Sequence, residues 1–373
     1  MTQYSLIACV LLFIPFIYAL SNGNPKSTAM KCSFILCMLL LFAISAFRGK
    51  TVGNDTHEYI RIFEEINSSY TWESRYEKGY LLLNFLLRKI SGDFQIVPIV
   101  TSAFILYSIG RFIWRYSKYP WLSLFILFTN FFSFITSGIR QSIAIAVLLW
   151  ATEFLIKKRY MFFVVSVIIA YSFHNSALLF LASLLLVKLQ ATWKLVFIYA
   201  IIGIMGSVLF SELLNIVFSF FSSYGNYVDG MYFEGDVRLA SILYCVVSSL
   251  VLIAALKVKN RLALNNQSVN ETNINNLMTI FAMTATVIYF LSLKVNLLDR
   301  FALYFNIFMI VLVPNILAAV HTKYRAVMIM LTIVFYYSYN ASILILRPNW
   351  SSLYPYEFFW NDNNVLFKSS SLV

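Results

Sequence analysis

Residues 157–194, KKRYMFFVVSVIIAYSFHNSALLFLASLLLVKLQATWK, decide how this chain is arranged in a membrane. A basic KKR trio opens the stretch, and Lys188 and Lys194 follow its apolar part. Lysine and arginine concentrate in the cytoplasmic loops of membrane proteins, so both ends lie on one side only if the stretch crosses twice. We therefore predict two short helices that meet at His174 and Asn175.

The composition extends this interpretation to the whole chain. Its 373 residues are 60% hydrophobic and only 12% charged, which excludes an ordinary soluble domain. A spanning helix needs about 20 mostly apolar residues. Twelve apolar stretches meet or approach this length: 4–20, 32–47, 96–113, 120–135, 141–156, 160–172, 175–187, 195–210, 238–256, 277–293, 301–320 and 327–345. We predict an all-α polytopic membrane protein, a single integral membrane domain over 1–373 with about twelve transmembrane helices.

The charge pattern predicts the orientation of these helices. With the N-terminus outside, the cytoplasmic connections hold 15 basic residues and only two acidic ones, Glu153 and Glu271. The net charge of +12 then divides into +13 inside and −1 outside, as the positive-inside rule requires. The basic excess is therefore a topology signal, and no nucleic-acid partner is expected.

The four longest segments outside the predicted spans are outer loops at 48–95 and 211–237, a polar cytoplasmic loop at 257–276, and an outer C-terminal tail at 346–373. Within the first loop, apolar residues recur at helical spacing from Tyr59 to Ile66, which predicts an amphipathic helix on the membrane surface. Asp55 and Glu58 precede it with capping-box spacing. A second apolar run, Tyr80 to Leu87, is too short to span and is expected to be re-entrant or interfacial.

Several ionisable residues stand at outer helix ends or in the first outer loop, and they are the candidates for chemistry: Arg48, Asp55, Glu77, Arg140, His174 and Arg300. Charged residues at membrane depth usually face a cavity or a partner. The four residues at helix ends can therefore converge on one outward cavity: Arg48, Arg140, His174 and Arg300. Structural roles are the alternatives. Arg140 could snorkel to the interface, and Arg300 could pair with Asp299.

The remaining candidates have structural alternatives too. Arg48 could be a stop-transfer charge, and His174 a hydrogen-bonded core residue. Asp55 fits a helix cap as well as a catalytic carboxylate, and Glu77 could be a solvated loop charge.

The arginines point to the class of ligand. Guanidinium groups stay charged and bind phosphate oxygens in pairs, so a lipid pyrophosphate fits the cavity. The chain contains no P-loop, HExxH, GxSxG or Asp-x-Asp motif, which argues against nucleotide hydrolysis, zinc proteolysis, serine esterase chemistry and the use of metal-bound sugar nucleotides. Asp229, Glu234 and Asp236 could hold a divalent cation, but such clusters are more often solvated loops. The four cysteines lie in apolar stretches without metal-ligand spacing. We therefore predict no metal site.

Six segments, in this order, resemble the EpsG family of Wzy-type polysaccharide polymerases: RGKTVGNDTHEYIRIFEEI, YEKGYLLLN, GIRQSIAIAV, FHNSALL, DRFALYF and LYPYEFF. The resemblance implies a GT-C-like, metal-independent glycosyltransferase of the bacterial cytoplasmic membrane, without a cofactor. It would join undecaprenyl-pyrophosphate-linked oligosaccharide repeat units into O-antigen or exopolysaccharide at the outer leaflet. A chain-length regulator and a flippase are its expected protein partners.

In that reaction we expect Arg140 and Arg300, with Arg48, to neutralise the departing pyrophosphate. His174 is the first candidate for the base, followed by Asp55 and Glu77. The residues expected to bind substrate are polar or aromatic: Arg48, Asn54, Thr56, Tyr80, Asn84, Gln141, Asn175, Tyr304 and Tyr356. The aromatic tail around Tyr354, Pro355, Tyr356 and Trp360 would form a lid or part of the saccharide groove.

Two other functions use similar residues. A membrane ligase or acyltransferase acting on lipid-linked glycans would make a single transfer instead of a ladder of repeats. A glycolipid transporter or flippase would need access from both faces. The polar residues gather on the predicted outer side, which favours an enzyme.

Overall fold

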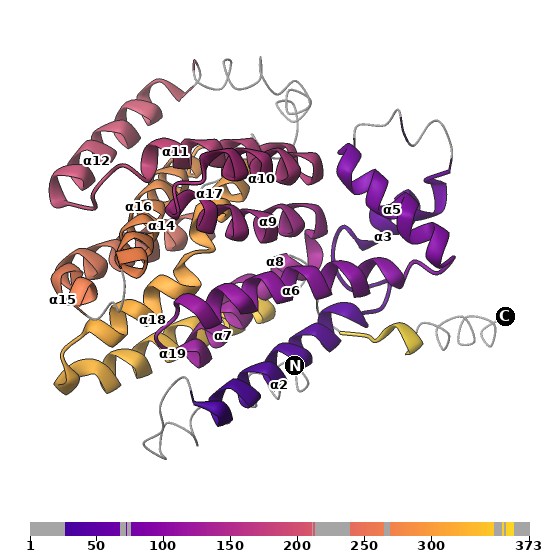
Figure 1. Cartoon of the computed structure of the whole chain (residues 1–373), viewed down its shortest axis with the longest axis horizontal. Helices are drawn as coiled ribbons and strands as arrows, with labels where there is room; N and C mark the ends of the chain where they lie inside the picture. The colour runs from indigo at the N-terminus through magenta and orange to yellow at the C-terminus, as the bar shows by residue number, and fades with distance from the viewer. Residues whose placement is uncertain are drawn as a thin grey trace. The chain divides into compact units, whose positions relative to one another are not determined.

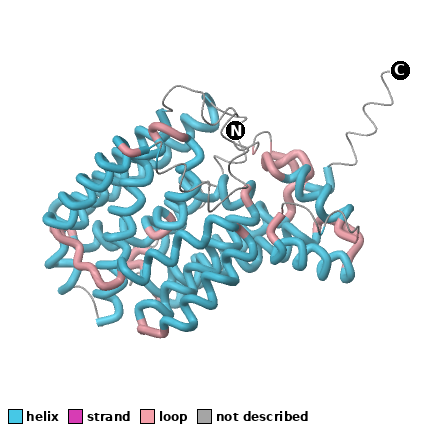
Figure 2. The backbone as a smooth tube through the Cα atoms, turned by 90° about the horizontal axis from the view of Figure 1, so that it is seen from above, coloured by secondary structure: helices cyan, strands magenta, loops and turns pink. Residues whose placement is uncertain are grey.

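The structure is a computed structural model that describes residues 27–67, 72, 76–210, 212, 239–264, 269–346, 353 and 356–361. These residues form helices and connecting loops without a strand, and an isolated bridge pairs Arg48 with Phe358 (Figure 2). The predicted all-α class is confirmed for this part of the chain. The predicted helix at 4–20 and the acidic residues Asp229, Glu234 and Asp236 lie outside the described residues.

The chain forms two compact units. The first contains Met1–Thr152, Phe162–Leu178 and His321–Val373, and the second contains Glu153–Met161 and Leu179–Val320.

The first unit contains these apolar helices: α2 (Thr28–Ala46), α6 (Ile96–Tyr116), α7 (Pro120–Ile126), α8 (Phe132–Ser137), α9 (Ile139–Ile156), α10 (Tyr160–Phe173) and α19 (Thr322–Leu346). Helix α2 runs along α6 (Figure 1), and the hydroxyls of Ser45 and Ser102 lie 2.8 Å apart between them. A π-helical turn, Leu127–Phe131, joins α7 to α8. Because a π-turn disturbs the regular hydrogen-bond ladder, the carbonyl of Thr129 can accept a bond from Asn340 of α19, at 2.8 Å.

The second unit contains α12 (Trp193–Val208), α14 (Leu239–Lys257), α15 (Lys259–Leu264), α16 (Val269–Ser292), α17 (Asp299–Asn306) and α18 (Met309–Ala319). Its core includes packed aromatic rings that are tilted against each other, with Phe180 5.4 Å from Phe281 and Phe281 4.8 Å from Phe308 between centroids. Helices α17 and α18 are bent by 49° relative to each other.

Six described helices are long and apolar enough to cross a membrane, or seven if the bent pair counts as one span. Four shorter apolar helices lie at Tyr160–Phe173, Asn175–Leu186, Trp193–Val208 and Ser241–Lys257. The chain is therefore a multi-pass membrane protein. The predicted break is confirmed, because α10 ends at Phe173 and the 3-10 helix η2 (Asn175–Ala182) begins after His174, followed by α11 (Ser183–Leu186).

The segment 48–95, predicted to be the first outer loop, carries the two predicted short helices. Helix α3 (Thr56–Glu65) buries Tyr59, Ile62 and Phe63, and helix α5 (Lys78–Ile90) covers the run expected to be re-entrant or interfacial. Asp55 occupies the N-cap position of α3, but its side chain makes no capping hydrogen bond. The capping-box interpretation is therefore wrong. Helix α15 and the start of α16 also occupy much of the segment expected to be a polar loop.

Candidate active site

Glu77 is the centre of the candidate active site. Its Oε2 accepts a hydrogen bond from Nη1 of Arg140 at 2.6 Å, and its Oε1 lies 3.0 Å from Nδ1 of His174. The backbone N–H of Asn175 also donates to Oε1, at 3.4 Å. The Glu77 side chain is 6% exposed, His174 15% and Arg140 25%. A buried carboxylate therefore joins one permanent cation to one imidazole.

Local structure explains how these residues meet. His174 directly follows the end of α10, and the change to a 3-10 helix frees the N–H of Asn175 from α-helical hydrogen bonding, so that it can face Glu77. Glu77 precedes α5 with extended backbone geometry. Gly79 then lets α5 approach α10 closely, because a Cβ at this position would lie 2.3 Å from Oγ of Ser172 and 2.6 Å from its carbonyl oxygen.

The electrostatics keep Glu77 ionised. Burial opposes its charge, but the hydrogen bond with His174 and the positive charge of Arg140 outweigh this effect and lower the pKa of Glu77 to about 2. A carboxylate that hydrogen-bonds Nδ1 favours the tautomer in which Nδ1 carries the proton. His174 then has Nε2 as a proton acceptor, while Glu77 positions the ring.

Two aromatic residues frame Arg140. Its guanidinium lies 5.5 Å from the ring centroid of Tyr76, and it is also close to the hydroxyl of Tyr59. The Tyr59 hydroxyl lies 3.5 Å from Oδ2 of Asp55. Burial and the Asp55 charge raise the pKa of Tyr59 to about 12, so this phenol stays protonated.

Arg48 belongs to a second buried polar group in the same unit. It is 3% exposed, and its Nη1 donates to the carbonyl of Ser45 at 2.6 Å. Its Nε and Nη2 have no hydrogen-bond partner among the described residues, nor do the Tyr80 hydroxyl and Oδ1 of Asn84. Burial lowers the pKa of Arg48 to about 10, which leaves it cationic at neutral pH. Unsatisfied buried donors require an explanation, and a bound anion or water supplies one.

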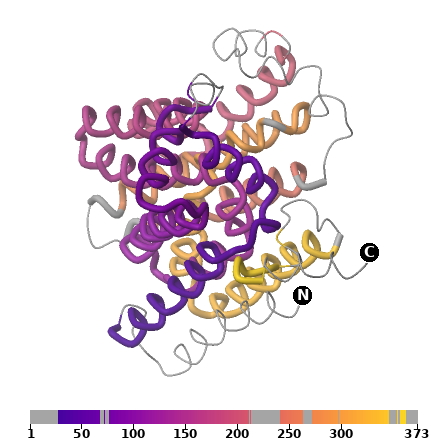
Figure 3. Tube along the Cα trace, turned by 90° about the vertical axis from the view of Figure 1, so that its right-hand side faces the viewer, coloured from indigo at the N-terminus to yellow at the C-terminus, as the bar shows by residue number. Residues whose placement is uncertain are grey.

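The C-terminal segment covers this end of the unit. The Gly49 N–H donates to the carbonyl of Glu357 at 2.8 Å, and the Phe359 N–H donates to Phe47 at 3.0 Å. Figure 3 shows this yellow segment against the end of indigo helix α2. The Tyr356 hydroxyl donates to the carbonyl of Ile44.

The aromatic tail predicted to form a lid or part of the saccharide groove belongs to this C-terminal segment. Phe47 also packs against Trp360, with ring centroids 6.4 Å apart. Tyr356 and Trp360 therefore join the C-terminal segment to the end of α2, while Tyr354 and Pro355 lie outside the described residues.

The other residues predicted to bind substrate differ in burial and in the unit to which they belong. Thr56 is buried and donates from Oγ1 to the carbonyl of Val52 at 2.6 Å, which is a structural role in the turn before α3. Gln141 is buried beside Arg140 in sequence, and Asn54 lies exposed in the turn. Arg300 and Tyr304 belong to α17 of the second unit.

Tyr76 is not among the site residues predicted from the sequence, and the pairing of Arg140 with Glu77 is not predicted either. Those partners are 63 residues apart in the chain, and no short motif relates them. Tyr76 had one available signal, its position directly before Glu77 in YEKGY.

Comparison with known proteins identifies the family of this chain. The model of the EpsG family matches residues 30–358, which is nearly the whole chain. No curated protein and no solved structure matches the chain. The matched range includes Glu77, Arg140 and His174 as well as the paired segments around Arg48 and Phe358. The chain belongs to the EpsG family.

Proposed function

We propose that this protein is a polysaccharide polymerase that transfers a growing glycan from a lipid pyrophosphate to a hydroxyl of the next lipid-linked repeat unit. EpsG is a Wzy-like polysaccharide polymerase family, and membership supports the general role. The cluster of Glu77, His174 and Arg140 supports the more specific chemistry. Its undecaprenyl-linked substrates, outward orientation and O-antigen or exopolysaccharide product are parts of the proposal.

The proposed step is a substitution at the anomeric carbon of the donor sugar. The acceptor oxygen forms a bond to this carbon as the bond to the pyrophosphate oxygen breaks. The acceptor proton passes to Nε2 of His174, whose Nδ1–H points at Glu77. The bonding electrons leave with the pyrophosphate, where the negative charge increases.

Arginine side chains suit this leaving group because they bind phosphate oxygens through paired donors. Arg140 retains a buried Nε without a hydrogen-bond partner among the described residues, in addition to the Nη1 that binds Glu77. Arg48 offers two such donors. We assign Arg140 to the leaving pyrophosphate and Arg48 to a phosphate of either lipid-linked substrate, with Arg300 as a third proposed contact.

In this proposal Glu77 positions the base and is not itself the base. Because its pKa is lowered to about 2, it is a weak base at neutral pH and serves best to orient His174. Asp55 lies next to Tyr59, so we assign it a supporting position at the cluster edge. Tyr80, Asn84, Gln141, Asn175, Tyr304 and Tyr356 remain proposed sugar contacts.

The decisive test is polymer length on a gel in a host that lacks its polymerase. Complementation uses wild type, Arg140→Ala or His174→Ala at matched membrane expression. Arg115→Ala and His57→Ala are matched controls, because both side chains are exposed and lie outside the cluster. We expect ladders from wild type and controls, and only single-repeat product from the two site variants.

The same gel separates the competing functions. A ligase or acyltransferase would give single transfers even with wild type. A flippase would change the amount of repeat unit at the outer face and would make no ladder from externally supplied lipid-linked units. A normal ladder from Arg140→Ala would contradict the proposed site.

A further inference from the structure

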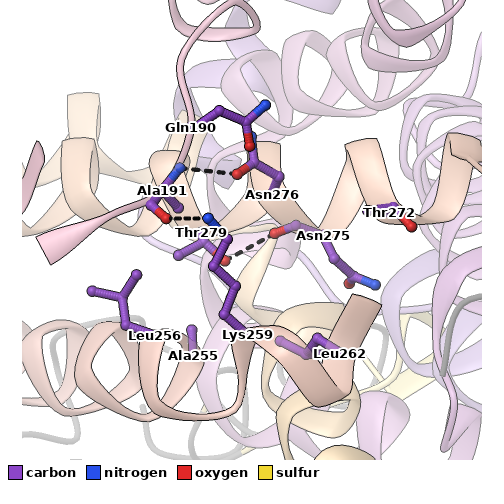
Figure 4. A pocket seen from close by; sticks show the side chains of 10 residues that line it. All are labelled: Gln190, Ala191, Ala255, Leu256, Lys259, Leu262, Thr272, Asn275, Asn276 and Thr279. Carbon is purple, nitrogen blue, oxygen red and sulfur yellow. Dashed lines mark hydrogen bonds between the residues drawn. The ribbon is translucent and has the colours of Figure 1, made fainter. Parts of the chain in front are cut away.

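A cavity of about 60 Å³ lies in the second unit, outside the candidate active site (Figure 4). The turn before α12, the end of α14, helix α15 and the first half of α16 form its walls. A single water needs about 10–15 Å³ of cavity. The space therefore admits a small polar group and is too small for a whole lipid.

The lining has a cationic and polar side. Lys259 is the one charged residue among those that line the cavity, and no carboxylate accompanies it there. Its Nζ donates to the carbonyl of Ala191 at 2.7 Å. An ammonium has three donors, so two N–H groups remain for a ligand. Gln190, Thr272 and Thr279 add further polar side chains to this wall.

Hydrogen bonds hold the polar wall in place. Asn276 accepts from the Ala191 N–H at 2.9 Å and donates to the carbonyl of Leu189, also at 2.9 Å, which fixes the turn before α12. Asn275 accepts from Asn315 at 2.8 Å and so links α16 to α18. Figure 4 shows Asn276 and Lys259 both bonded to the Ala191 backbone. The cavity is therefore a built feature of the unit.

The opposite wall is aliphatic. Ala255, Leu256 and Leu262 line it, and Leu256 continues into a buried apolar cluster with Leu252 and Ile280. A polar wall with one cation facing an aliphatic wall suits an amphipathic molecule with an anionic head. The surroundings agree, because the exposed residues nearby in sequence include Lys188 and Lys194, on the side predicted to be cytoplasmic.

We propose that this cavity binds the phosphate headgroup of an anionic phospholipid. The phosphate accepts hydrogen bonds from Lys259 and Gln190, while the glycerol and the acyl chains extend out of the cavity. Basic pockets between transmembrane helices on the cytoplasmic side are a known mode of anionic lipid recognition. The proposal is independent of the polymerase reaction.

The test titrates the purified full-length protein in detergent with phosphatidylglycerol and measures retained lipid by native mass spectrometry. Lys259→Gln removes the charge in the cavity, and Lys257→Gln removes an exposed charge two residues away as the matched control. A basic residue contributes about 1 kcal/mol to anionic lipid binding, so Lys259→Gln should weaken affinity about fivefold. Lys257→Gln should leave the affinity close to that of wild type.

Further arms identify the ligand and guard against misfolding. Lys259→Arg keeps the positive charge and should keep the affinity for phosphatidylglycerol. A loss of affinity in Lys259→Gln alone would then come from the lost charge and not from a disturbed contact with Ala191. Phosphatidylcholine and inorganic phosphate at the same concentrations should bind poorly. Equal phosphatidylglycerol binding by Lys259→Gln and wild type would overturn the proposal. So would equal binding of phosphatidylcholine, or displacement of the lipid by inorganic phosphate.

Discussion

Glu77 shows at the residue scale how one buried carboxylate can connect two functional groups. Its two oxygens take different partners, Oε2 the guanidinium of Arg140 and Oε1 the imidazole of His174. Either interaction alone would leave part of the carboxylate unsatisfied in a site where its side chain is only 6% exposed. The ion pair of Glu77 with Arg140 and its hydrogen bond with His174 therefore support each other.

Replacing Glu77 by Gln should impair catalysis. The amide keeps the size of the side chain but removes the charge that orients His174. General-base catalysis contributes about 100- to 10,000-fold, so we expect polymerisation to fall by at least about 100-fold. The measurement is the rate of ladder formation in membranes with supplied lipid-linked repeat units. Activity within about twofold of wild type would remove His174 and Glu77 from the mechanism.

The pKa of Glu77 also predicts how stability depends on pH. The folded-state pKa lies near 2, below the ordinary value of 4.5, so the stabilising effect of ionisation is present above about 4.5 and is lost as pH falls toward 2. Removing the Glu77 charge from its ion pair with Arg140 should lower the free energy of unfolding by about 2–4 kcal/mol at neutral pH. Thermal unfolding between pH 6 and 3 should therefore show a difference in Tm between wild type and Glu77→Gln that narrows as the pH falls. A constant difference would contradict this account.

At the scale of elements, the site depends on two helix ends that approach each other closely. Helix α5 begins directly after Glu77, and α10 ends directly before His174. Gly79 makes the approach possible, because a side chain there would overlap the backbone of Ser172. The loop helix and the apolar helix therefore act together to position the carboxylate.

Gly79→Ala tests that contact. Its Cβ would meet the Ser172 carbonyl oxygen at 2.6 Å, and a backbone atom cannot move aside as a flexible side chain can. Overpacking of this kind costs about 1–3 kcal/mol, so we expect a lower Tm together with lower polymerase activity. Gly92→Ala is the matched control, because no atom lies within 4 Å of its added Cβ. Equal Tm values for the two variants would show that α5 does not need this close approach.

At the scale of the whole molecule, the number of crossings follows from the short helices on either side of His174. The structure shows the break, but α10 and Asn175–Leu186 are each shorter than an ordinary span. The charges at 157–159 and at Lys188 predict that both ends of this stretch lie in the cytoplasm.

Cysteine labelling of intact cells tests the topology. In a cysteine-free background, His57→Cys should react with a membrane-impermeant maleimide, whereas Lys157→Cys and Lys188→Cys should react only after permeabilisation. All three native side chains are exposed in the structure, so burial does not explain protection. Outside labelling at only one of the two lysine positions would mean that the stretch crosses once, and His174 would then lie within the bilayer.

The sequence by itself determined the class of the protein and much of its helical pattern. Long apolar runs must form helices in a bilayer, because no water is available there to satisfy the backbone, and the break at His174 follows from the basic residues on both sides. The residues of the candidate site were also recognisable one by one, because charged groups in apolar surroundings are costly without a function.

Only the tertiary structure decided which of these residues are partners. Glu77 is 63 residues from Arg140 and 97 from His174, so their meeting depends on helix packing and on the absence of a side chain at Gly79. The tertiary structure also pairs Arg48 with Phe358 of the C-terminal segment. In addition, helices α15 and α16 occupy much of the segment predicted to be a polar loop. Helical periodicity is a local property that neighbouring residues encode, whereas a carboxylate finds its partners only when distant helices pack together.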